Sequence, residues 1–285
     1  MFFPNARQVL NADHPLSSYK LLLVAGSISR PQHRNLCMSL LKPFVQDGEI
    51  PIDYLCCGRH LHTTLRLTDL RSDFQSLREL VATDSYHLNP GFHADRVIDC
   101  GGNIGMFTLR AAAAISASSG KMPKFTICEP VPHNLKQIRK NLSANGIDAE
   151  IIPACVGGRR SSIPFYCREA NAGSFDPSRP YTSQIEVPVI TLQEAITTDS
   201  DAERILIKLD IEGMEYEVLE AFLPTEQRAI YLVGELHRYQ ENLVRLERLF
   251  QRHGWTLSAY DCADDCCIFY GYSPAAAAAF SSYQQ

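Results

Sequence analysis

The sequence predicts an α/β protein whose central sheet is mostly parallel. From Arg96 onward, short apolar strands alternate with helical segments, beginning with a strand over 96–100 and a helix over 104–116. Repeated βα units of this kind build parallel sheets with helices on both faces. The last two strands, over 255–260 and 266–272, have only a turn between them. They therefore predict an antiparallel hairpin at one edge of the sheet.

The second βα unit has clear boundary signals. Its strand, over 124–129, stops at Pro130, and its helix, over 132–144, begins with a proline in the first turn. The Asn145-Gly146 pair that follows is typical of a helix end. A third strand is predicted over 149–154.

The second half continues the alternation after an irregular insertion. The segment 157–184 is rich in Gly, Arg, Ser and Pro, and it predicts loops, including 171–174, apart from a strand over 163–167. A strand over 187–191 precedes a short helix. The remaining elements are predicted as a buried strand over 204–210, a helix over 214–222, a strand over 229–235 and a helix over 239–253.

Residues 1–95 differ in character from the rest. Apolar residues at helical spacing predict one helix over 36–45 and another over 70–81. Between them, β-branched residues over 50–67, interrupted at 57–59, predict a hairpin. The predicted organisation is an N-terminal α+β extension over 1–95 (a lid, a substrate wall or a dimer surface), a main domain over 96–273 and a tail over 274–285.

The composition is that of an ordinary globular chain. Of its 285 residues, 45% are hydrophobic and 21% are charged, which allows a sizeable core. The net charge of −5 argues against a general nucleic-acid binder, whose binding face would be basic. No apolar run reaches the ~20 residues that cross a bilayer, and the N-terminus lacks a convincing signal peptide. We therefore expect neither nucleic acid nor a membrane as a partner.

The ten cysteines include no C-x-x-C pair of the kind that binds zinc. Cys100 and Cys128 stand inside apolar strands, where a free thiol behaves as a small hydrophobe. Such thiols favour a reducing cytoplasm as the location of the protein.

A glycine turn follows the first strand of the main domain. Residues 99–105 read Asp-Cys-Gly-Gly-Asn-Ile-Gly. Gly101 and Gly102 permit a sharp turn and a close approach of the backbone to a ligand, and Asn103 can satisfy amide groups near the helix start. The spacing is not the G-x-G-x-x-G of dinucleotide-binding turns, so the turn has less reason to wrap a pyrophosphate.

Glu129 stands at the tip of the second strand, where a carboxylate can accept hydrogen bonds from both hydroxyls of a ribose. Together with the glycine turn, it suits a nucleoside cofactor better than a dinucleotide. S-adenosylmethionine is the commonest ligand of that kind. A tight βα turn without a ligand remains the alternative.

Four acids, Asp99, Glu129, Asp210 and Glu235, each stand at the end of a predicted strand. In open α/β sheets, ligands bind beyond the carboxyl ends of the strands. Four acids on one rim are hard to explain by packing. They predict a binding site there.

The segment 207–215 reads Ile-Lys-Leu-Asp-Ile-Glu-Gly-Met-Glu and places Lys208 and Asp210 on one face of a strand. A lysine in a buried strand is costly unless it is paired or functional. In one interpretation Lys208 neutralises neighbouring acids, while Glu212 and Glu215 favour a helix N-terminus. In the other, Asp210 faces the reaction site, and the two glutamates hold the loop or an acceptor group.

His237, at the end of the next strand, is the natural partner of Asp210. Its unperturbed pKa lies near working pH, so it can remove a hydroxyl proton. A divalent metal held by Asp210, Glu235 and His237 is an alternative, because two carboxylates and one imidazole suit such an ion. Structural or substrate-orienting contacts are a third interpretation. We expect no metal.

These segments together resemble FkbM-type methyltransferases, a branch of the class I S-adenosylmethionine-dependent enzymes. The similarity covers roughly residues 65–237, and Ser72-Asp73 resembles the lead-in of that family. Cys100, Gly102 and Cys128 depart from its commoner residues, and the first 65 residues show no clear match. The matching segments, in family order, are 97–105, 129–134 with Asn141 downstream, 207–215 and 235–237.

The resemblance implies a Rossmann-like class I methyltransferase sheet of seven strands, S-adenosylmethionine as methyl donor and usually an oxygen acceptor. It implies that Glu129 binds the ribose hydroxyls. From the residues themselves we expect that Asp210 or His237 orients or deprotonates the acceptor, supported by Lys208 and Glu212. The resemblance places Asp99, Gly101, Gly102 and Asn103 at the methionine and ribose end of the cofactor. Gly105, in the same turn, is a further candidate cofactor-binding residue.

We therefore expect methylation of a hydroxyl on a small molecule or a glycan-like metabolite. An N-methyltransferase and a non-catalytic S-adenosylmethionine-binding protein are the alternatives on this fold. A nicotinamide oxidoreductase on a similar sheet is a further rival. A homodimer also stays open, since the front section could form a dimer surface.

Overall fold

The computed structural model describes most of the chain. The helix predicted over 36–45 lies outside the described residues except for Val45, and so do residues 278–285 of the tail. The described residues are 45, 47–79, 84–88, 93–167, 173–174, 181, 183–196, 203–226, 228–263 and 265–277.

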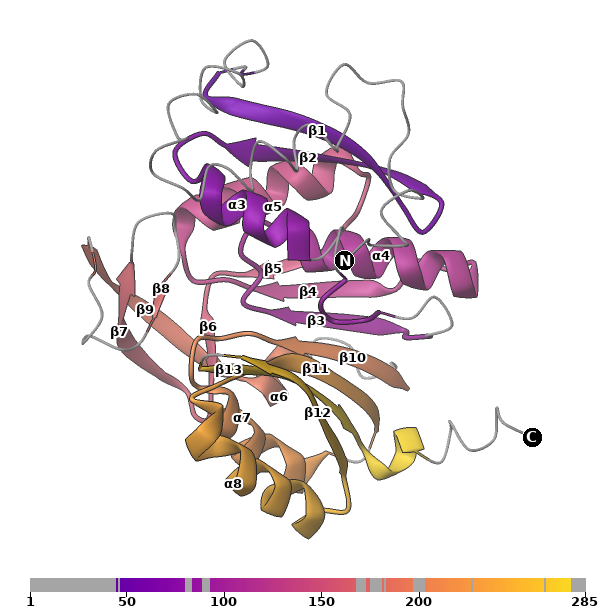
Figure 1. Cartoon of the computed structure of the whole chain (residues 1–285), viewed down its shortest axis with the longest axis vertical. Coiled ribbons are helices and arrows are strands. Elements are labelled where there is room, and N and C mark those ends of the chain that lie inside the picture. Colours follow the sequence, from indigo (N-terminus) through magenta and orange to yellow (C-terminus); the bar gives the residue numbers. More distant parts are fainter. Residues whose placement is uncertain are drawn as a thin grey trace.

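Seven strands form the central sheet, in the order β12-β13-β11-β10-β3-β4-β5 (Figure 1). β13 runs antiparallel to both of its neighbours, whereas the other neighbouring strands are parallel. The predicted fold class, a mostly parallel sheet with an antiparallel hairpin at its edge, is confirmed. The strands are β3 (Arg96–Cys100), β4 (Lys124–Cys128), β5 (Glu150–Ile152), β10 (Arg204–Leu209), β11 (Ala229–His237), β12 (Thr256–Ala263) and β13 (Cys266–Tyr272).

Helices cover both faces of this sheet. α4 and α5 lie on one side, and α6, α7 and α8 lie on the other (Figure 1). Each face has its own buried apolar cluster, as the repeated βα units require. The helices are α4 (Met106–Ser119), α5 (Pro132–Ala144), α6 (Leu192–Ile196), α7 (Glu215–Phe222) and α8 (Tyr239–Arg252), with a short 3₁₀ turn, η5 (Leu223–Thr225), after α7.

Helix α4 begins two residues later than predicted. Gly105 precedes it with a left-handed φ of 83°, and Asn103 also has a positive φ, of 48°. The glycine turn therefore takes up residues that the sequence pattern assigned to the helix. Gly120, at φ 68°, ends the helix after Ser119.

The described residues of the insertion form a second, small sheet. The strands predicted over 163–167 and 187–191 are confirmed, whereas the loop predicted over 171–174 contains a short strand over 173–174, so the expectation of an irregular segment is wrong there. Phe165, Val187 and Val189 point inward with Val131 and Cys155, while the residues between them stay more exposed. Both strands extend beyond their predicted starts, and each carries a proline, at positions 164 and 188. The sheet has the order β6-β9-β7-β8, with β6 (Cys155–Gly157), β7 (Ser161–Cys167), β8 (Gly173–Ser174) and β9 (Ser183–Thr191).

The predicted front hairpin and the helix after it are confirmed. They lie over α4 and α5 (Figure 1), and a buried ion pair fixes them. Arg66 binds Asp73 through Nη2 and Oδ1 at 2.5 Å, and its Nη1 donates to Asn134 Oδ1 on α5 at 2.8 Å. The elements are β1 (Glu49–Cys56), β2 (Arg59–Arg66) and α3 (Leu70–Leu77).

Asn141, on α5, links three elements. Its Oδ1 accepts a hydrogen bond from the backbone N–H of Thr64 on β2 at 2.9 Å, and its Nδ2 donates to the carbonyl of Ile104 at 2.8 Å. The side chain is fully buried. This asparagine therefore joins the front hairpin to the glycine turn.

Replacing Asn141 by alanine is expected to lower the free energy of unfolding by about 1 to 3 kcal/mol, because the buried carbonyl of Ile104 and the partly buried N–H of Thr64 lose their partner. Urea denaturation measures this change. Ser143→Ala, at an exposed position of the same helix, serves as the control and should stay within about 0.5 kcal/mol. An Asn141→Ala variant as stable as this control would show that the link is dispensable.

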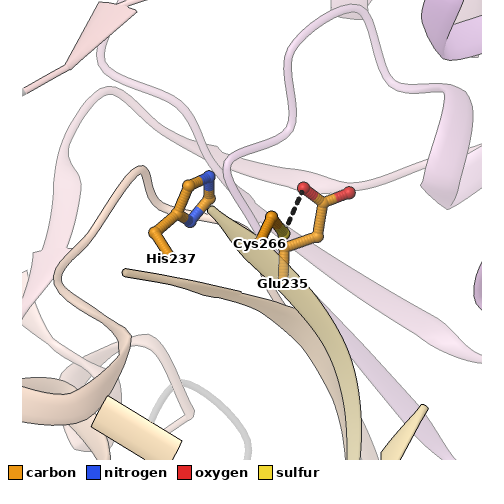
Figure 2. A group of neighbouring side chains, drawn as sticks. All are labelled: Glu235, His237 and Cys266. Carbon is orange, nitrogen blue, oxygen red and sulfur yellow. Dashed lines mark hydrogen bonds between the residues drawn. The ribbon is translucent and has the colours of Figure 1, made fainter. Parts of the chain in front are cut away.

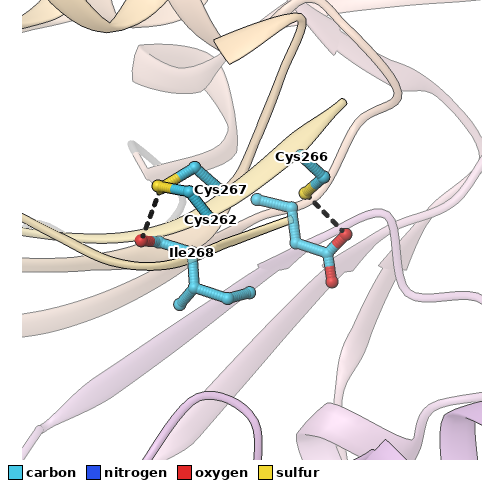
Figure 3. The surroundings of a disulfide bond; sticks show 5 residues. Cys262, Cys266, Cys267 and Ile268 are labelled. Atoms are coloured by element: carbon cyan, nitrogen blue, oxygen red, sulfur yellow. Dashed lines mark hydrogen bonds between the residues drawn. A yellow bond between two sulfur atoms is a disulfide. The ribbon is translucent and has the colours of Figure 1, made fainter. Parts of the chain in front are cut away.

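One disulfide joins cysteines of the described chain. Cys262 and Cys267 are opposite each other in the β12–β13 pairing and are bonded (Figure 3). The spacing gave no signal for this bond, since the two residues meet only when the strands pair. Cys100 and Cys128 are free and buried, as expected.

Among the described helices, none combines the length and apolar character needed to cross a bilayer.

Candidate active site

A cavity of about 260 Å³ lies at the carboxyl ends of the central strands. α3 and Glu79, two residues after its end, form one wall, and the small sheet forms another. The strand tips supply most of its polar groups. Its lining includes Ser72, Gln75, Ser76 and Glu79 from the α3 side, Cys155, Val156 and Phe165 from the small sheet, and Gly101, Asn103, Glu129, Asp210, Glu212 and Glu235 from the strand tips.

The glycine turn is required by packing within the protein. A Cβ on Gly101, whose φ is 85°, would lie 1.9 Å from the carbonyl oxygen of Asp210. A Cβ on Gly102 would lie 2.3 Å from Cγ2 of Ile127. These two glycines therefore let β3 fit against its neighbouring strands, a reason that the sequence analysis did not foresee. Gly102 and Gly105 are not among the residues that line the cavity.

Asn103 lies between the turn and α3. Its backbone N–H donates to Glu129 Oε2 at 2.8 Å, and its Nδ2 donates to Ser76 Oγ at 3.0 Å. The amide oxygen of Asn103 is buried and has no hydrogen-bond partner among the described residues. This oxygen is thus an unused hydrogen-bond acceptor at the wall of the cavity.

Glu129 is only 4% exposed but borders the cavity. Its Oε1 accepts hydrogen bonds from the backbone N–H of Val131 at 2.9 Å and from Asn134 Nδ2 at 3.2 Å. Burial raises the pKa of Glu129 to about 7, although these hydrogen bonds and that from Asn103 act to lower it. A partner that donates hydrogen bonds to the carboxylate would favour its ionised form.

Lys208 connects the tips of two strands from beneath the cavity. Its Nζ donates to the carbonyl of Gly101 at 2.7 Å and lies 3.3 Å from Asp210 Oδ2 and 3.6 Å from Asp99 Oδ1. Burial opposes the charged form, but the two aspartates outweigh it and raise the pKa of Lys208. This geometry supports the interpretation of a lysine that neutralises neighbouring acids.

Asp99 is fully buried and does not line the cavity. Its Oδ2 accepts a hydrogen bond from Thr108 Oγ1 at 2.8 Å, and its Oδ1 faces Lys208. The structure therefore connects Asp99 to the site through Lys208, beneath the residues that border the cavity.

Tyr86 brings a hydroxyl from the front section to the strand tips. Its Oη lies 3.2 Å from Glu235 Oε1 and 3.5 Å from Asp210 Oδ2. The charge of Asp210, together with burial, raises the pKa of Glu235 to about 7. Glu235 is thus a carboxyl group that titrates near neutral pH at the wall of the cavity.

His237 does not line the cavity and lies behind the acidic residues that do. Its Nδ1 lies 2.9 Å from Oε1 of the buried Glu215, and its Nε2 lies 3.9 Å from Glu212 Oε2. Burial alone would lower the pKa of His237, but Glu215 and other nearby carboxylates outweigh it and raise this pKa to about 10. His237 is therefore protonated at neutral pH, and the geometry does not support it as the base.

Two overlapping sets of side chains have the spacing of metal ligands within the described residues. One is Glu235, His237 and Cys266 (Figure 2), and the other is Asp210, Glu212 and His237. The set expected from the sequence, Asp210 with Glu235 and His237, is divided between them. Both sets depend on an imidazole that carries its proton and is bound by Glu215, so an ion would first have to displace that proton.

The structure thus brings most of the predicted residues together and adds others. Glu129, Asp210 and Glu212 border one cavity with the glycine turn, while Lys208 and His237 support them from behind. Sequence reasoning missed the bordering Glu79, and it missed Tyr86. Tyr86 stands alone in an unpatterned segment, so no sequence signal marked it. Glu235 was predicted to border the site from its position at a strand end, but it was assigned no role there other than that of a possible metal ligand.

Comparison with solved structures gives distant matches, and the strand order rather than these matches establishes the fold. A precorrin-6y C5,15-methyltransferase from Geobacter metallireducens GS-15 is 11% identical, with a TM-score of 0.43, over 68% of this chain and 87% of that one. A 16S rRNA N2 G1207 methyltransferase from T. thermophilus is 12% identical, with a TM-score of 0.45, over 80% of this chain and 51% of that one. No curated protein matches the chain.

A family comparison gives a more extensive match. Residues 99–256, more than half of the chain, match the methyltransferase FkbM domain. The matched range includes Gly101, Asn103, Glu129, Asp210 and Glu235, which border the cavity at the strand tips. The chain therefore belongs to the FkbM methyltransferase domain family.

Proposed function

We propose that this protein transfers the methyl group of S-adenosylmethionine to a hydroxyl of a small molecule or glycan-like metabolite. The observation that carries the proposal is the arrangement of the cavity. One end offers the buried carboxylate of Glu129 and the unpartnered amide oxygen of Asn103. The other end offers Asp210 and Glu235. Membership of the family supports the reaction class.

The residues present fit the cofactor. Glu129 would accept hydrogen bonds from the ribose hydroxyls, and the Asn103 amide oxygen would accept one from the methionine ammonium group. The acidic end of the cavity suits a positively charged sulfonium, because opposite charges attract strongly in a partly buried site. When bound, this cofactor supplies an electrophilic methyl group.

The residues at the acidic end would prepare the acceptor. Asp210 and Glu235 can each accept a hydrogen bond from an acceptor hydroxyl, and Tyr86 restrains both carboxylates. Glu235 is suited to take up the proton, since a base works best when its pKa lies near the working pH. Alignment of the hydroxyl with the methyl group supplies much of the rate, and Lys208 and Glu212 maintain the position of the rim.

A product-mass screen tests this proposal. The purified protein is incubated with cell extract and methyl-labelled S-adenosylmethionine, and the expected result is one labelled metabolite that gains a single methyl group on oxygen. Binding of S-adenosylhomocysteine without any labelled product would favour a non-catalytic binding protein. Stabilisation by NAD but not by S-adenosylhomocysteine in a thermal-shift assay would favour an oxidoreductase.

A second candidate, methylation of an amine, is favoured by the charge of the rim. Glu79, Asp210, Glu212 and Glu235 all line the cavity, and they would attract a cationic acceptor. Lys208 is the nearby basic group, and it is already bound to Asp99 and Asp210. The labelled product distinguishes the two candidates by the atom that carries the new methyl group.

Replacing Glu129 by glutamine is expected to weaken S-adenosylhomocysteine binding by about 10- to 100-fold, since hydrogen bonds to a charged group contribute about 1.5 to 3 kcal/mol. Calorimetry measures the affinity, with Glu217→Gln, an exposed position on α7, as the control. Wild-type affinity should rise between about pH 6 and pH 8, because the ribose hydroxyls bind the ionised form of a group whose pKa is about 7. Unchanged affinity in the Glu129 variant would remove this residue from the cofactor site.

A further inference from the structure

The turn between β1 and β2 carries two adjacent cysteines outside the cavity. Cys56 is the last residue of β1, and Cys57 and Gly58 form the turn with positive φ values of 50° and 78°. Cys56 is buried, whereas Cys57 is half-buried. The turn therefore keeps one thiol inside and leaves its neighbour partly open to solvent.

Arg110, on α4, reaches this turn from below the hairpin. Its side chain is largely buried, and its Nη1 donates to Cys57 Sγ at 2.7 Å. Its Nη2 donates to Asp84 Oδ2 at 2.8 Å and to the carbonyl of Leu88 at 3.2 Å. The guanidinium group is thus fixed by its other partners, with one N–H group directed at the sulfur.

The ionisable groups that act on the Cys57 sulfur come from three elements. They are Cys56 on β1, Arg110 on α4 and Asp84 in the segment before β3. A hydrogen bond with the Cys56 thiol lowers the pKa of Cys57 most, and Arg110 lowers it further, against burial and the charge of Asp84. The pKa of Cys57 falls to about 6. Cys56 keeps its proton, since the same hydrogen bond and burial raise its own pKa.

We propose that Cys57 is a modification site whose thiolate reacts with small electrophiles and with two-electron oxidants of the peroxide class. With hydrogen peroxide, the thiolate sulfur attacks one oxygen, so that an S–O bond forms, the O–O bond breaks and hydroxide leaves. The sulfur is oxidised to sulfenic acid, and the peroxide is reduced. A partly exposed thiolate beside an arginine is the environment in which cysteines are reactive. This site does not depend on the proposed methyl transfer.

The chain contains its own comparison thiols. Cys167 and Cys266 are also half-buried cysteines that are not bonded in a disulfide. Cys266 has the opposite environment, since its Sγ lies 3.4 Å from Glu235 Oε2 (Figure 2). Burial and the charge of Glu235 raise the pKa of Cys266. Cys57 and Cys266 are thus similarly exposed but differ in their partner. Cys57, which contacts Arg110, should therefore react, and Cys266, which contacts Glu235, should not.

Alkylation kinetics test the proposal on the full chain. The protein receives a short pulse of iodoacetamide between pH 5 and pH 9, and mass spectrometry of its peptides locates the label. Cys57 is expected to react at least about tenfold faster than Cys266 at pH 7, with a half-maximal rate near pH 6. Equal rates for the two cysteines would overturn the proposal.

Two variants keep the test specific. Cys56→Ser retains a hydrogen-bond donor and leaves Cys57 as the one thiol of the adjacent pair, so it should preserve the fast reaction at Cys57. Arg110→Lys retains a positive charge but loses the directed N–H group, so it should move the half-maximal rate to higher pH. If the Arg110→Lys variant has a wild-type circular dichroism spectrum but Cys57 still reacts with the wild-type rate and pH dependence, the proposal is also overturned.

A peroxide experiment tests the oxidation directly. After brief treatment with hydrogen peroxide, dimedone should trap a sulfenic acid at Cys57 ahead of Cys167 and Cys266. Cys57→Ser should lose this adduct while keeping its affinity for S-adenosylhomocysteine. A dimedone adduct found first at Cys266, or none at Cys57 at any peroxide concentration, would contradict the assignment.

Discussion

Replacing Asp210 by asparagine is expected to lower the turnover of methyl transfer by about 10²- to 10⁴-fold, the usual contribution of a positioned acid–base group. Asp210 borders the cavity, lies 3.3 Å from Lys208 Nζ and accepts from the Tyr86 hydroxyl at 3.5 Å. Asparagine keeps the shape of the side chain but removes its charge. Turnover is measured with labelled S-adenosylmethionine and the acceptor fraction that the product screen identifies.

The control for this variant is Asp148→Asn, an identical change at an exposed position after α5. It should leave turnover unchanged, and both variants should bind S-adenosylhomocysteine within a few-fold of wild type. If the Asp210 variant turns over at the wild-type rate, then Asp210 has no part in the reaction.

The pH profile gives this variant a second readout. The charge of Asp210 is the main cause that raises the pKa of Glu235 to about 7. If Glu235 is the base, wild-type turnover rises with pH through about 7, because only the ionised carboxylate accepts a proton. Without the Asp210 charge, the pKa of Glu235 falls toward its ordinary value, and the residual activity should rise at lower pH. Glu235→Gln should abolish the rise.

Replacing Lys208 by methionine is expected to lower the free energy of unfolding by about 3 to 5 kcal/mol, since one member of a buried charge cluster is lost. Lys208 is 4% exposed and Asp99 is 0% exposed. The variant leaves the Asp99 carboxylate buried without its cation, and it also removes the hydrogen bond to the Gly101 carbonyl. Urea denaturation measures the loss.

The matched control is Lys136→Met, at an exposed position on α5, which should change stability by less than about 0.5 kcal/mol. Adding Asp99→Asn to the Lys208 variant should recover part of the loss, because the unpaired charge is removed. A Lys208→Met protein as stable as its control would mean that this lysine does not hold the strand tips together.

The regular part of the fold was predictable because its signals are local. The helix over 132–144 was predicted to the residue, since its first-turn proline and the Asn145-Gly146 pair mark both ends. The small sheet was predictable only in part. Strands over 163–167 and 187–191 were predicted, but their antiparallel pairing and the short strand β8 depend on contacts between separate segments. The Cys262–Cys267 bond likewise depends on strand pairing.

The sequence predicted which acids stand at the carboxyl ends of the strands, but it did not predict the protonation of the neighbouring groups. Strand-end position alone placed Glu129 and Asp210 at one edge, since parallel strands share their carboxyl ends. The proton on His237 follows from Glu215, which reaches it only through the folding of α7 beside β11. Tyr86 reaches Glu235 across 149 positions of sequence, a contact that periodicity cannot reveal.

The most direct test is a crystal structure of the protein with S-adenosylhomocysteine. The account predicts that the Glu129 carboxylate lies within hydrogen-bond distance of both ribose hydroxyls, with the Asn103 amide oxygen bound to the ammonium group. It also predicts that the sulfur faces Asp210 and Glu235. A ligand found outside this cavity, or one whose sulfur points away from the two acids, would contradict it.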